Sequence, residues 1–159
     1  FKIFDNSHHF KFNPTIKVVN FENDYIHFHI DEKWKFFNKN IHDNFIELFS
    51  KFSSKKNIVL TSNLGKNDLY EKLYEKFFNN KNFEFIKSPN FSELISIVYF
   101  AKTCVSSHSG FIVHLAACCK KSIIDIVPKN IFNELDRWIP FNINYKRYDI
   151  CDIKSVSFD

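Results

Sequence analysis

This chain of 159 residues contains two glycines and no Met, not even at position 1. No G-x-G-x-x-G and no G-x-x-x-x-G-K-[ST] occurs, which disfavours the common dinucleotide and nucleoside-triphosphate sites. A G-x-S-x-G elbow is also missing, so a serine hydrolase is a poor fit. The lack of Met leads us to expect that the sequence is a piece of a longer protein.

Cysteine is present without a metal-binding pattern. The four cysteines show no C-x-x-C spacing and no histidines at zinc-finger distances, which argues against a zinc site and fits reduced thiols. No apolar run reaches membrane-spanning length and no signal peptide is visible, so we expect a cytoplasmic protein. The formal net charge is +4, and the basic residues are scattered among acidic ones without a basic tract. This pattern does not indicate nucleic-acid binding, and it leaves an anionic small molecule or a membrane surface open as the partner.

The pattern of apolar residues predicts alternating strands and helices. With 45% hydrophobic residues the chain is long enough for one globular domain with its own core. Short connections between strands and helices imply a Rossmann-like α/β fold, a doubly wound parallel sheet of five or six strands. The expected strands are 25–30, 57–61, 83–86, 102–106 and 122–127, with a further short one at 16–19; the expected helices are 41–52, 68–78, 91–99, 110–119 and 132–138.

Three segments follow from this reading. Residues 1–23 are irregular and are interpreted as an inter-domain linker or partial strand. Residues 24–150 form the α/β domain, and 151–159 is a C-terminal tail.

The stretch from Ser106 to Gly110 is the strongest candidate for a ligand site. Three serines, one histidine and one glycine form the turn between an expected strand and helix. A helix N-terminus at the carboxyl end of a parallel strand offers unpaired N–H groups and a positive dipole end to an anion. Ser109 is a candidate N-cap, and Gly110 lets a ligand approach the backbone. The turn therefore predicts a phosphate site that includes Ser107 and His108.

His114 follows one turn into a helix with almost no polar residues, which predicts an element buried on all sides. Helical side chains lean toward the N-terminus, so His114 could reach an anion bound there. The alternative is a core histidine bonded to a backbone carbonyl. The sequence leaves these two interpretations open.

The end of the first strand offers a second set of polar residues. Alternation places His27, His29 and Asp31 on one face. They could ligate a metal, but three ligands along one strand are a weak signal, and His27 packed under a helix is the favoured interpretation. The turn that follows brings Lys33, which could neutralise a phosphate, and Trp34, which could shape the pocket.

Two features near the C-terminus have structural interpretations. Asp125 lies inside an apolar strand, where a carboxylate needs partners, and we expect it to bond the neighbouring turn. The basic residues Arg137, Lys146 and Arg147, together with Trp138, are expected on the solvated surface.

The motifs HIDEKW and VSSHSGFIVHLAACCKKSIIDIV resemble the nucleotide-sugar-binding half of GT-B glycosyltransferases, especially the heptosyltransferase-like family. That family has a D-T-G-x-x-H-L-A-A motif at the helix that holds the donor diphosphate. The resemblance covers roughly residues 24–140. Ser109 matches the Thr, Gly110 the Gly and His114 the His, whereas Lys33 and Trp34 match a Lys and Trp after the first strand. His108 replaces the Asp that contacts the donor sugar in that family, and one extra residue lies between Gly110 and His114. The identity of the donor sugar, whether heptose, fucose or another, is therefore left open.

The resemblance implies one half of a GT-B fold, the donor-binding domain of an inverting glycosyltransferase. It implies no cofactor and no metal, a nucleotide-diphosphate sugar as donor, and a glycan or lipopolysaccharide-type acceptor in cell-envelope polysaccharide synthesis. A peripheral contact with the inner face of the membrane is compatible with this role. The acceptor site and catalytic base would belong to an N-terminal domain of the same protein, so this fragment alone is expected to bind without turnover. The alternatives are a non-catalytic phosphate- or sugar-binding module and a polysaccharide pyruvyl transferase-like domain.

Overall fold

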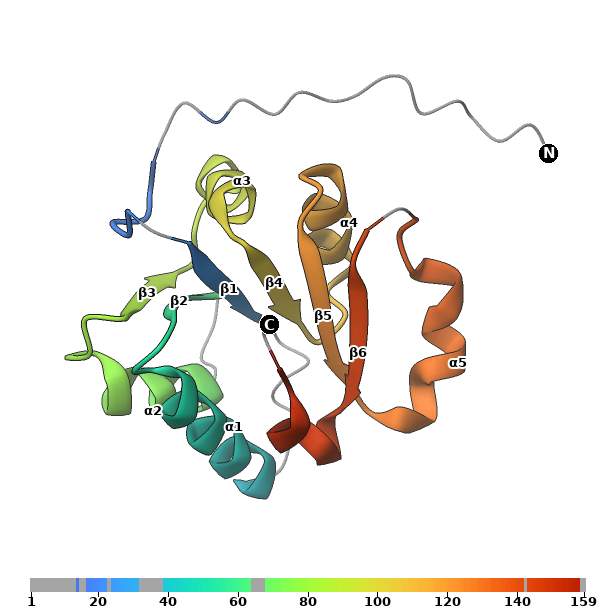
Figure 1. Ribbon diagram of the computed structural model, residues 1–159, viewed down its shortest axis with the longest axis horizontal. Coiled ribbons are helices and arrows are strands. Elements are labelled where there is room, and N and C mark those ends of the chain that lie inside the picture. Colours follow the sequence, from blue (N-terminus) through green and yellow to red (C-terminus); the bar gives the residue numbers. More distant parts are fainter. Residues whose placement is uncertain are drawn as a thin grey trace.

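A parallel six-stranded sheet forms the centre of the molecule (Figure 1). The computed structural model describes residues 14, 17–22, 24–31, 39–63, 68–141 and 143–157. The strand order is β3-β2-β1-β4-β5-β6. The strands are β1 (Tyr25–Ile30), β2 (Asn57–Ser62), β3 (Phe83–Lys87), β4 (Thr103–Ser106), β5 (Ser122–Val127) and β6 (Tyr145–Asp149).

Helices cover both faces of this sheet, so the fold is the predicted Rossmann-like α/β architecture. Figure 1 places α1 and α2 below the strands, α3 and α4 above them, and α5 beyond β6. The helices are α1 (Lys39–Phe52), α2 (Asp68–Phe77), α3 (Phe91–Phe100), α4 (Gly110–Cys118) and α5 (Phe132–Leu135), with short 3₁₀ turns at η2 (Lys129–Ile131), η3 (Asp136–Trp138) and η4 (Ile150–Ser155).

Alternation along each strand divides the core into two layers. Phe28 of β1 belongs to the layer under α1 and α2, where its ring meets the rings of Phe45 and Phe49 edge-on at 5.7 and 5.0 Å. Tyr25 of the same strand faces the other way, and its hydroxyl donates to the carbonyl of Ile97 in α3 over 2.6 Å. The two faces of β1 thus fix one helix layer on each side of the sheet.

Local signals in the sequence set the ends of α3. Asn90 accepts a hydrogen bond from the backbone N–H of Glu93, and the Glu93 carboxylate accepts one from the backbone N–H of Asn90. This reciprocal capping box satisfies two N–H groups that a helix start leaves unpaired. The structure therefore confirms the expected start of this helix.

Two strand predictions need correction. In the strand expected at 16–19, residues 17–19 form no strand, and Ile16 lies outside the described residues. Conversely, Tyr145–Asp149 forms β6, which the sequence analysis did not locate because its residues alternate weakly and lie at the sheet edge. β6 pairs with β5 in parallel, so it completes the sheet.

The segment expected as a C-terminal tail has ordered contacts. Ile150, Ile153 and Val156 belong to the core layer that contains α1. Because η4 packs against α1, residues 150–156 help to close the lower face of the sheet. The domain boundary at 151 stays a prediction.

Candidate functional site

The order of strands brings the ends of β1 and β4 together. β1 lies between β2 and β4 in the sheet. After β1 the chain continues to β2 and β3 on one side, whereas after β4 it continues to β5 and β6 on the other side. In open α/β sheets the crevice at such a switch point, beyond the carboxyl ends of the strands, is where ligands bind. Asp31 follows β1 at this edge and Ser107 follows β4, and the Ser107 hydroxyl donates to Asp31 Oδ1 over 3.0 Å. This bond joins the two strand ends.

The β4–α4 turn presents the N-terminus of α4 beside this junction. Ser109 occupies the N-cap position, as expected, but its side chain makes no capping hydrogen bond. A Cβ built on Gly110 would have no atom within 4 Å, so the first helical residue faces open space. The first N–H groups of a helix have no intrahelical acceptor. The turn therefore offers accessible backbone donors.

The prediction of a helix buried on all sides is wrong for α4. Ile112, Val113, Leu115 and Ala116 are buried, whereas Phe111, His114 and Cys118 lie on an exposed face. The reason is that α4 belongs to the outer layer and packs against the sheet with one side only. His114 is thus not a core histidine, and it lies four residues after Gly110, on the same side of the helix.

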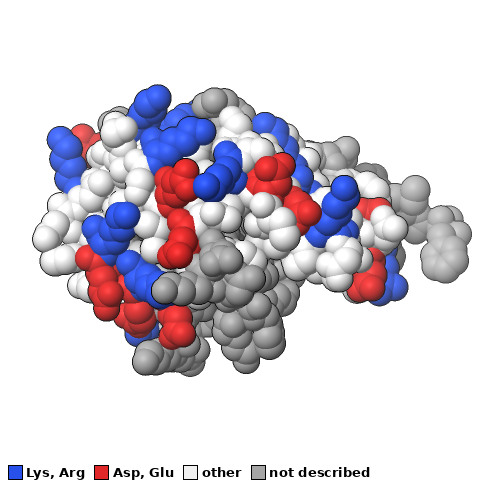
Figure 2. Space-filling model, turned by 90° about the horizontal axis from the view of Figure 1, so that it is seen from below, with Lys and Arg blue, Asp and Glu red and all other residues white. Residues whose placement is uncertain are grey.

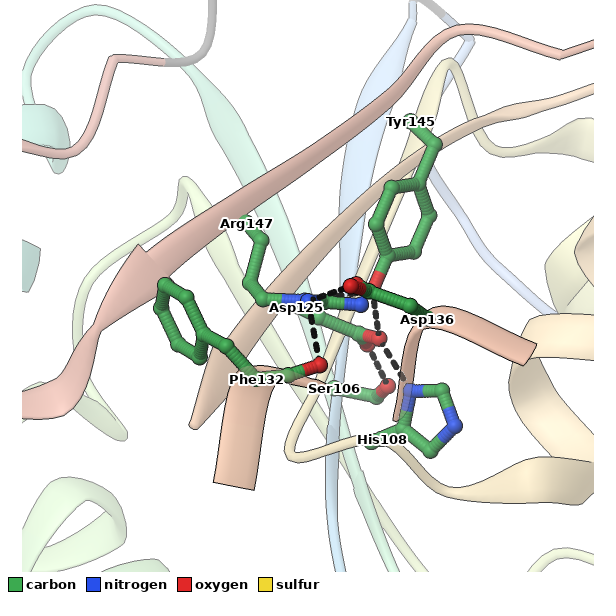
Figure 3. A network of polar contacts seen from close by, with 7 residues as sticks. All are labelled: Ser106, His108, Asp125, Phe132, Asp136, Tyr145 and Arg147. Carbon is green, nitrogen blue, oxygen red and sulfur yellow. Dashed lines mark hydrogen bonds and ion pairs between the residues drawn. The ribbon is translucent and has the colours of Figure 1, made fainter. Parts of the chain in front are cut away.

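Asp125 is the centre of a buried polar network, shown in Figure 3. Its carboxylate has no exposed surface and accepts three hydrogen bonds. Ser106 donates to Oδ1 over 2.8 Å, whereas His108 Nδ1 and the Tyr145 hydroxyl donate to Oδ2 over 2.5 and 2.7 Å. The expectation that Asp125 bonds the neighbouring turn is confirmed. His108 adopts a left-handed backbone conformation with φ 58°.

Arg147 extends this network, and its prediction as a solvated surface residue is wrong. Only 10% of its side chain is exposed. Its Nε donates to the Tyr145 hydroxyl over 3.2 Å, and Nη1 donates to the Phe132 carbonyl and to Asp136 Oδ1 over 2.9 and 2.8 Å. Sequence reasoning missed it because burial of Arg147 depends on β6 and on the packing of α5 and η3. Arg137 is exposed, as expected.

Burial keeps the tyrosine of this network in its donor form. Desolvation, and next the charge of Asp125, raise the pKa of Tyr145 far above its usual value. The hydroxyl therefore retains its proton and remains a donor to the carboxylate.

The predicted metal set on β1 has another arrangement. His27 Nε2 and His29 Nδ1 each lie 2.8 Å from the hydroxyl of Thr61 on β2, so one threonine joins the two rings. Burial lowers the pKa of His27 well below 6.5, which favours the neutral ring. Among the described residues no group of three metal-ligating side chains could hold an ion.

Hollows formed by the described residues lie at the opposite ends of the strands, near Asp24 before β1 and near Asn57 and Asn82 at the starts of β2 and β3. In the described part of the chain no helix has the length and apolar character needed to cross a bilayer. Figure 2 shows Lys and Arg mixed with Asp and Glu on the lower face, without a large patch of one sign among its described residues.

The predicted site residues thus have these positions. Ser107, His108, Ser109 and Gly110 form one continuous turn at the switch point, and His114 lies one helical turn further on the exposed side of α4. Lys33 and Trp34 lie outside the described residues.

These features define a Rossmann-like α/β domain whose open helix terminus lies at the switch point. The fold is similar to the UDP-GlcNAc 2-epimerase of Methanocaldococcus jannaschii in complex with UDP-GlcNAc and UDP, with TM-score 0.61 and 16% identity over 80% of this chain and 35% of that one. It is also similar to the heptosyltransferase WaaC of E. coli, with TM-score 0.52 and 16% identity over 79% of this chain and 37% of that one in the structure with ADP. The structure of WaaC with ADP-2-deoxy-2-fluoro heptose gives TM-score 0.54, with 17% identity over 79% of this chain and 36% of that one.

The chain therefore spans 35% to 37% of the length of these proteins, and its fold is that of one half of a GT-B structure. No family model matches the chain, and no curated protein matches it by sequence. At such low identity the likeness establishes the fold alone, and function must be argued from the site.

Proposed function

We propose that this chain is the donor-binding domain of an inverting GT-B glycosyltransferase, which moves a sugar from a nucleotide-diphosphate donor to a glycan or lipid-linked acceptor. The observation that carries the proposal is the open start of α4, at Ser109 and Gly110, beside the junction of β1 and β4. The likeness of the fold to a heptosyltransferase and to an epimerase with bound nucleotides supports it.

In this proposal the backbone N–H groups at the start of α4 bind the diphosphate. As the glycosidic bond breaks, negative charge develops on the departing phosphate oxygen, and donors already directed at that position stabilise the transition state. His114, on the same side of α4 as Gly110, and Lys33 would add donors or positive charge. Trp34, Ser107 and His108 would line the donor site. These donors would take the place of a metal.

The other half of the reaction requires residues outside this chain. A base must accept the proton of the acceptor hydroxyl, and we place that base and the acceptor site in an N-terminal domain. The acceptor would belong to a cell-envelope saccharide at the cytoplasmic face of the membrane. This fragment alone should therefore bind the donor and transfer no sugar.

Thermal stabilisation by ADP, GDP, UDP and CDP tests the proposal, because a ligand that binds only the folded state raises the melting temperature. At a ligand concentration one hundred times Kd the stabilisation is about 2.7 kcal/mol. We expect one diphosphate to raise the melting temperature most. If none of the four changes it, the chain is no donor-binding domain.

A non-catalytic module that binds phosphate or a sugar is the alternative from another class. The same accessible start of α4 would serve it. Inorganic phosphate or a free sugar would then stabilise the chain as well as any nucleotide does, whereas the donor-binding proposal requires a nucleotide preference.

A further inference from the structure

Basic and aromatic side chains gather where β4, β5 and β6 begin. These three strands are neighbours in the sheet, and Figure 1 places their starting ends on the upper side, beside the end of α4. Three segments surround these ends, and together they are called the basic–aromatic patch: residues 99–102, 119–121 and 137–141. The candidate donor site lies at the opposite ends of the strands, so the patch is a separate surface.

The charged residues of the patch are all positive. Lys102, Lys120 and Arg137 are exposed, and Lys121 is half-buried. The three segments contain no Asp or Glu, and the adjacent Asp136 already forms an ion pair with a buried arginine at 2.8 Å. On the lower face, by contrast, Figure 2 shows Lys and Arg mixed with Asp and Glu. The patch therefore presents net positive charge to solvent.

Large aromatic rings are exposed within the same patch. Phe141 is 92% exposed, Trp138 52% and Phe100 44%. A basic residue after the end of a helix is common, because it complements the negative end of the helix dipole. That effect does not account for aromatic rings left in water beside the charges. Neighbouring apolar side chains that stay exposed mark a surface that binds something else.

Cations and rings are paired in the patch. The Lys121 ammonium lies over the Tyr99 ring at 5.5 Å, and the Arg137 guanidinium lies over the Trp138 ring at 5.6 Å. The Tyr99 ring in turn meets the Phe100 ring edge-on at 5.1 Å. Positive charge and apolar surface thus alternate over single side chains. This composition suits the boundary of a bilayer, where aromatic rings sit at headgroup level and basic residues meet anionic headgroups.

We propose that the basic–aromatic patch binds the surface of a bilayer that contains anionic phospholipids. Its four cations attract the headgroup phosphates, and the rings of Trp138 and Phe141 enter the boundary between headgroups and acyl chains. This inference goes beyond the proposed function and does not depend on it. A domain that shares the donor crevice would cover the carboxyl ends of the strands, so it would leave the patch accessible to a membrane.

Flotation with vesicles tests the inference. The probes are vesicles of phosphatidylcholine alone and vesicles that also contain phosphatidylglycerol. We expect this chain to float with the second kind and not with the first. Binding should weaken as the salt concentration rises, because salt screens the attraction between charges. A chain that floats with neither kind, or equally with both, overturns the inference.

Removal of single charges locates the contact. Lys102→Gln and Lys120→Asn should each weaken vesicle binding about fivefold, which is the contribution of one basic side chain near an anionic surface. Asn suits the left-handed backbone of Lys120, whose φ is 54°. Lys76→Gln is the matched control: this exposed lysine also lies over a ring, that of Phe77 at 5.8 Å, but it belongs to α2 on the other side of the sheet. Equal losses in the three variants would indicate diffuse attraction to the whole chain and overturn the inference.

Removal of an exposed ring tests the apolar part of the contact. Phe141→Ser should weaken vesicle binding about tenfold, because the buried ring no longer contributes. Phe78→Ser is the control, since Phe78 is 55% exposed but precedes β3, at the far edge of the sheet from β6. It should leave vesicle binding unchanged. Equal effects of the two substitutions count against the patch.

Trp138 reports insertion directly. Brominated phospholipid should quench part of the tryptophan fluorescence of the bound chain. Trp138→Phe should remove that quenching, although Trp34, the other tryptophan of the chain, remains. A bound chain whose Trp138 is not quenched uses another surface, which overturns the inference.

The same variants separate a membrane from other partners. A chain that binds a DNA duplex through Lys102 and Lys120 and floats with no vesicle has a nucleic-acid site instead, which overturns the inference. Nucleoside diphosphates should stabilise Lys102→Gln as they stabilise the unsubstituted chain. Failure of the donor-binding proposal therefore leaves this inference standing, and failure of this inference leaves the donor-binding proposal standing.

Discussion

Arg147 of β6 lies beside Asp125 of β5 in the parallel register, and the hydroxyl of Tyr145 bridges the two. The bridge donates to the carboxylate over 2.7 Å and accepts from the guanidinium over 3.2 Å. Through it, the sheet edge is connected to the turn that begins α4. The stability of the edge strand and the geometry of the candidate site therefore depend on the same side chains.

The first prediction concerns that connection. Arg147→Met keeps the apolar stem but removes the hydrogen bonds to Tyr145, to the Phe132 carbonyl and to Asp136. Hydrogen bonds from a charged group contribute about 1.5–3 kcal/mol, so we expect the free energy of unfolding to fall by about that amount. Urea denaturation measures the change.

Arg137 provides the control, because it is exposed and its guanidinium lies over the Trp138 ring at 5.6 Å. Arg137→Met should change the free energy of unfolding by less than about 0.5 kcal/mol. Equal effects of the two substitutions would contradict a structural role for Arg147.

The second prediction concerns the open start of α4. No atom lies within 4 Å of a Cβ added to Gly110, and its backbone is not in the left-handed region. Gly110→Ala should therefore raise the free energy of unfolding by about 0.4–1 kcal/mol, because the unfolded chain loses freedom. Gly110→Leu should also leave the fold intact, but its side chain would occupy the space in front of the helix terminus and abolish nucleotide binding.

Melting temperatures with and without the stabilising nucleoside diphosphate separate these effects. A folded Gly110→Leu variant whose affinity equals that of the unsubstituted chain would remove the argument for a phosphate site at this turn. A variant that fails to fold would instead contradict the open geometry.

The third prediction concerns pH. Burial holds the pKa of His27 well below 6.5. As the pH falls, His27 is therefore protonated at a higher pH in the unfolded chain than in the folded one. The stability due to neutral His27 is fully present above about pH 6.5 and is lost as the pH falls below it. The loss reaches about 1.4 kcal/mol per pH unit for one proton.

Unfolding free energies of the unsubstituted chain and of His27→Gln, measured between about pH 7.5 and pH 5, show this contribution as a difference. Gln can retain a hydrogen bond to Thr61 but does not titrate in that range. Parallel pH profiles of the two proteins would show that His27 does not remain neutral when folded.

Several features could be predicted because they depend on residues close together in the sequence. Apolar spacing located α1, α2 and α3, and the start of α3 is fixed by hydrogen bonds between Asn90 and Glu93, which are close neighbours in the chain. The strand, turn and helix around Ser109 and Gly110 follow from the same local rules. The site residues themselves stay a prediction that the binding experiments above will test.

The sequence by itself determined the alternation of strands and helices, and hence the parallel sheet, since side-chain periodicity and turn residues act over a few positions. Only the tertiary structure decided that Arg147 is buried, that His114 is exposed, and that His108 bonds Asp125 across 17 positions of the chain. The physical reason is that burial and hydrogen-bond partners depend on which elements lie side by side. That arrangement is fixed by the order of the strands and by the packing of the helices on them.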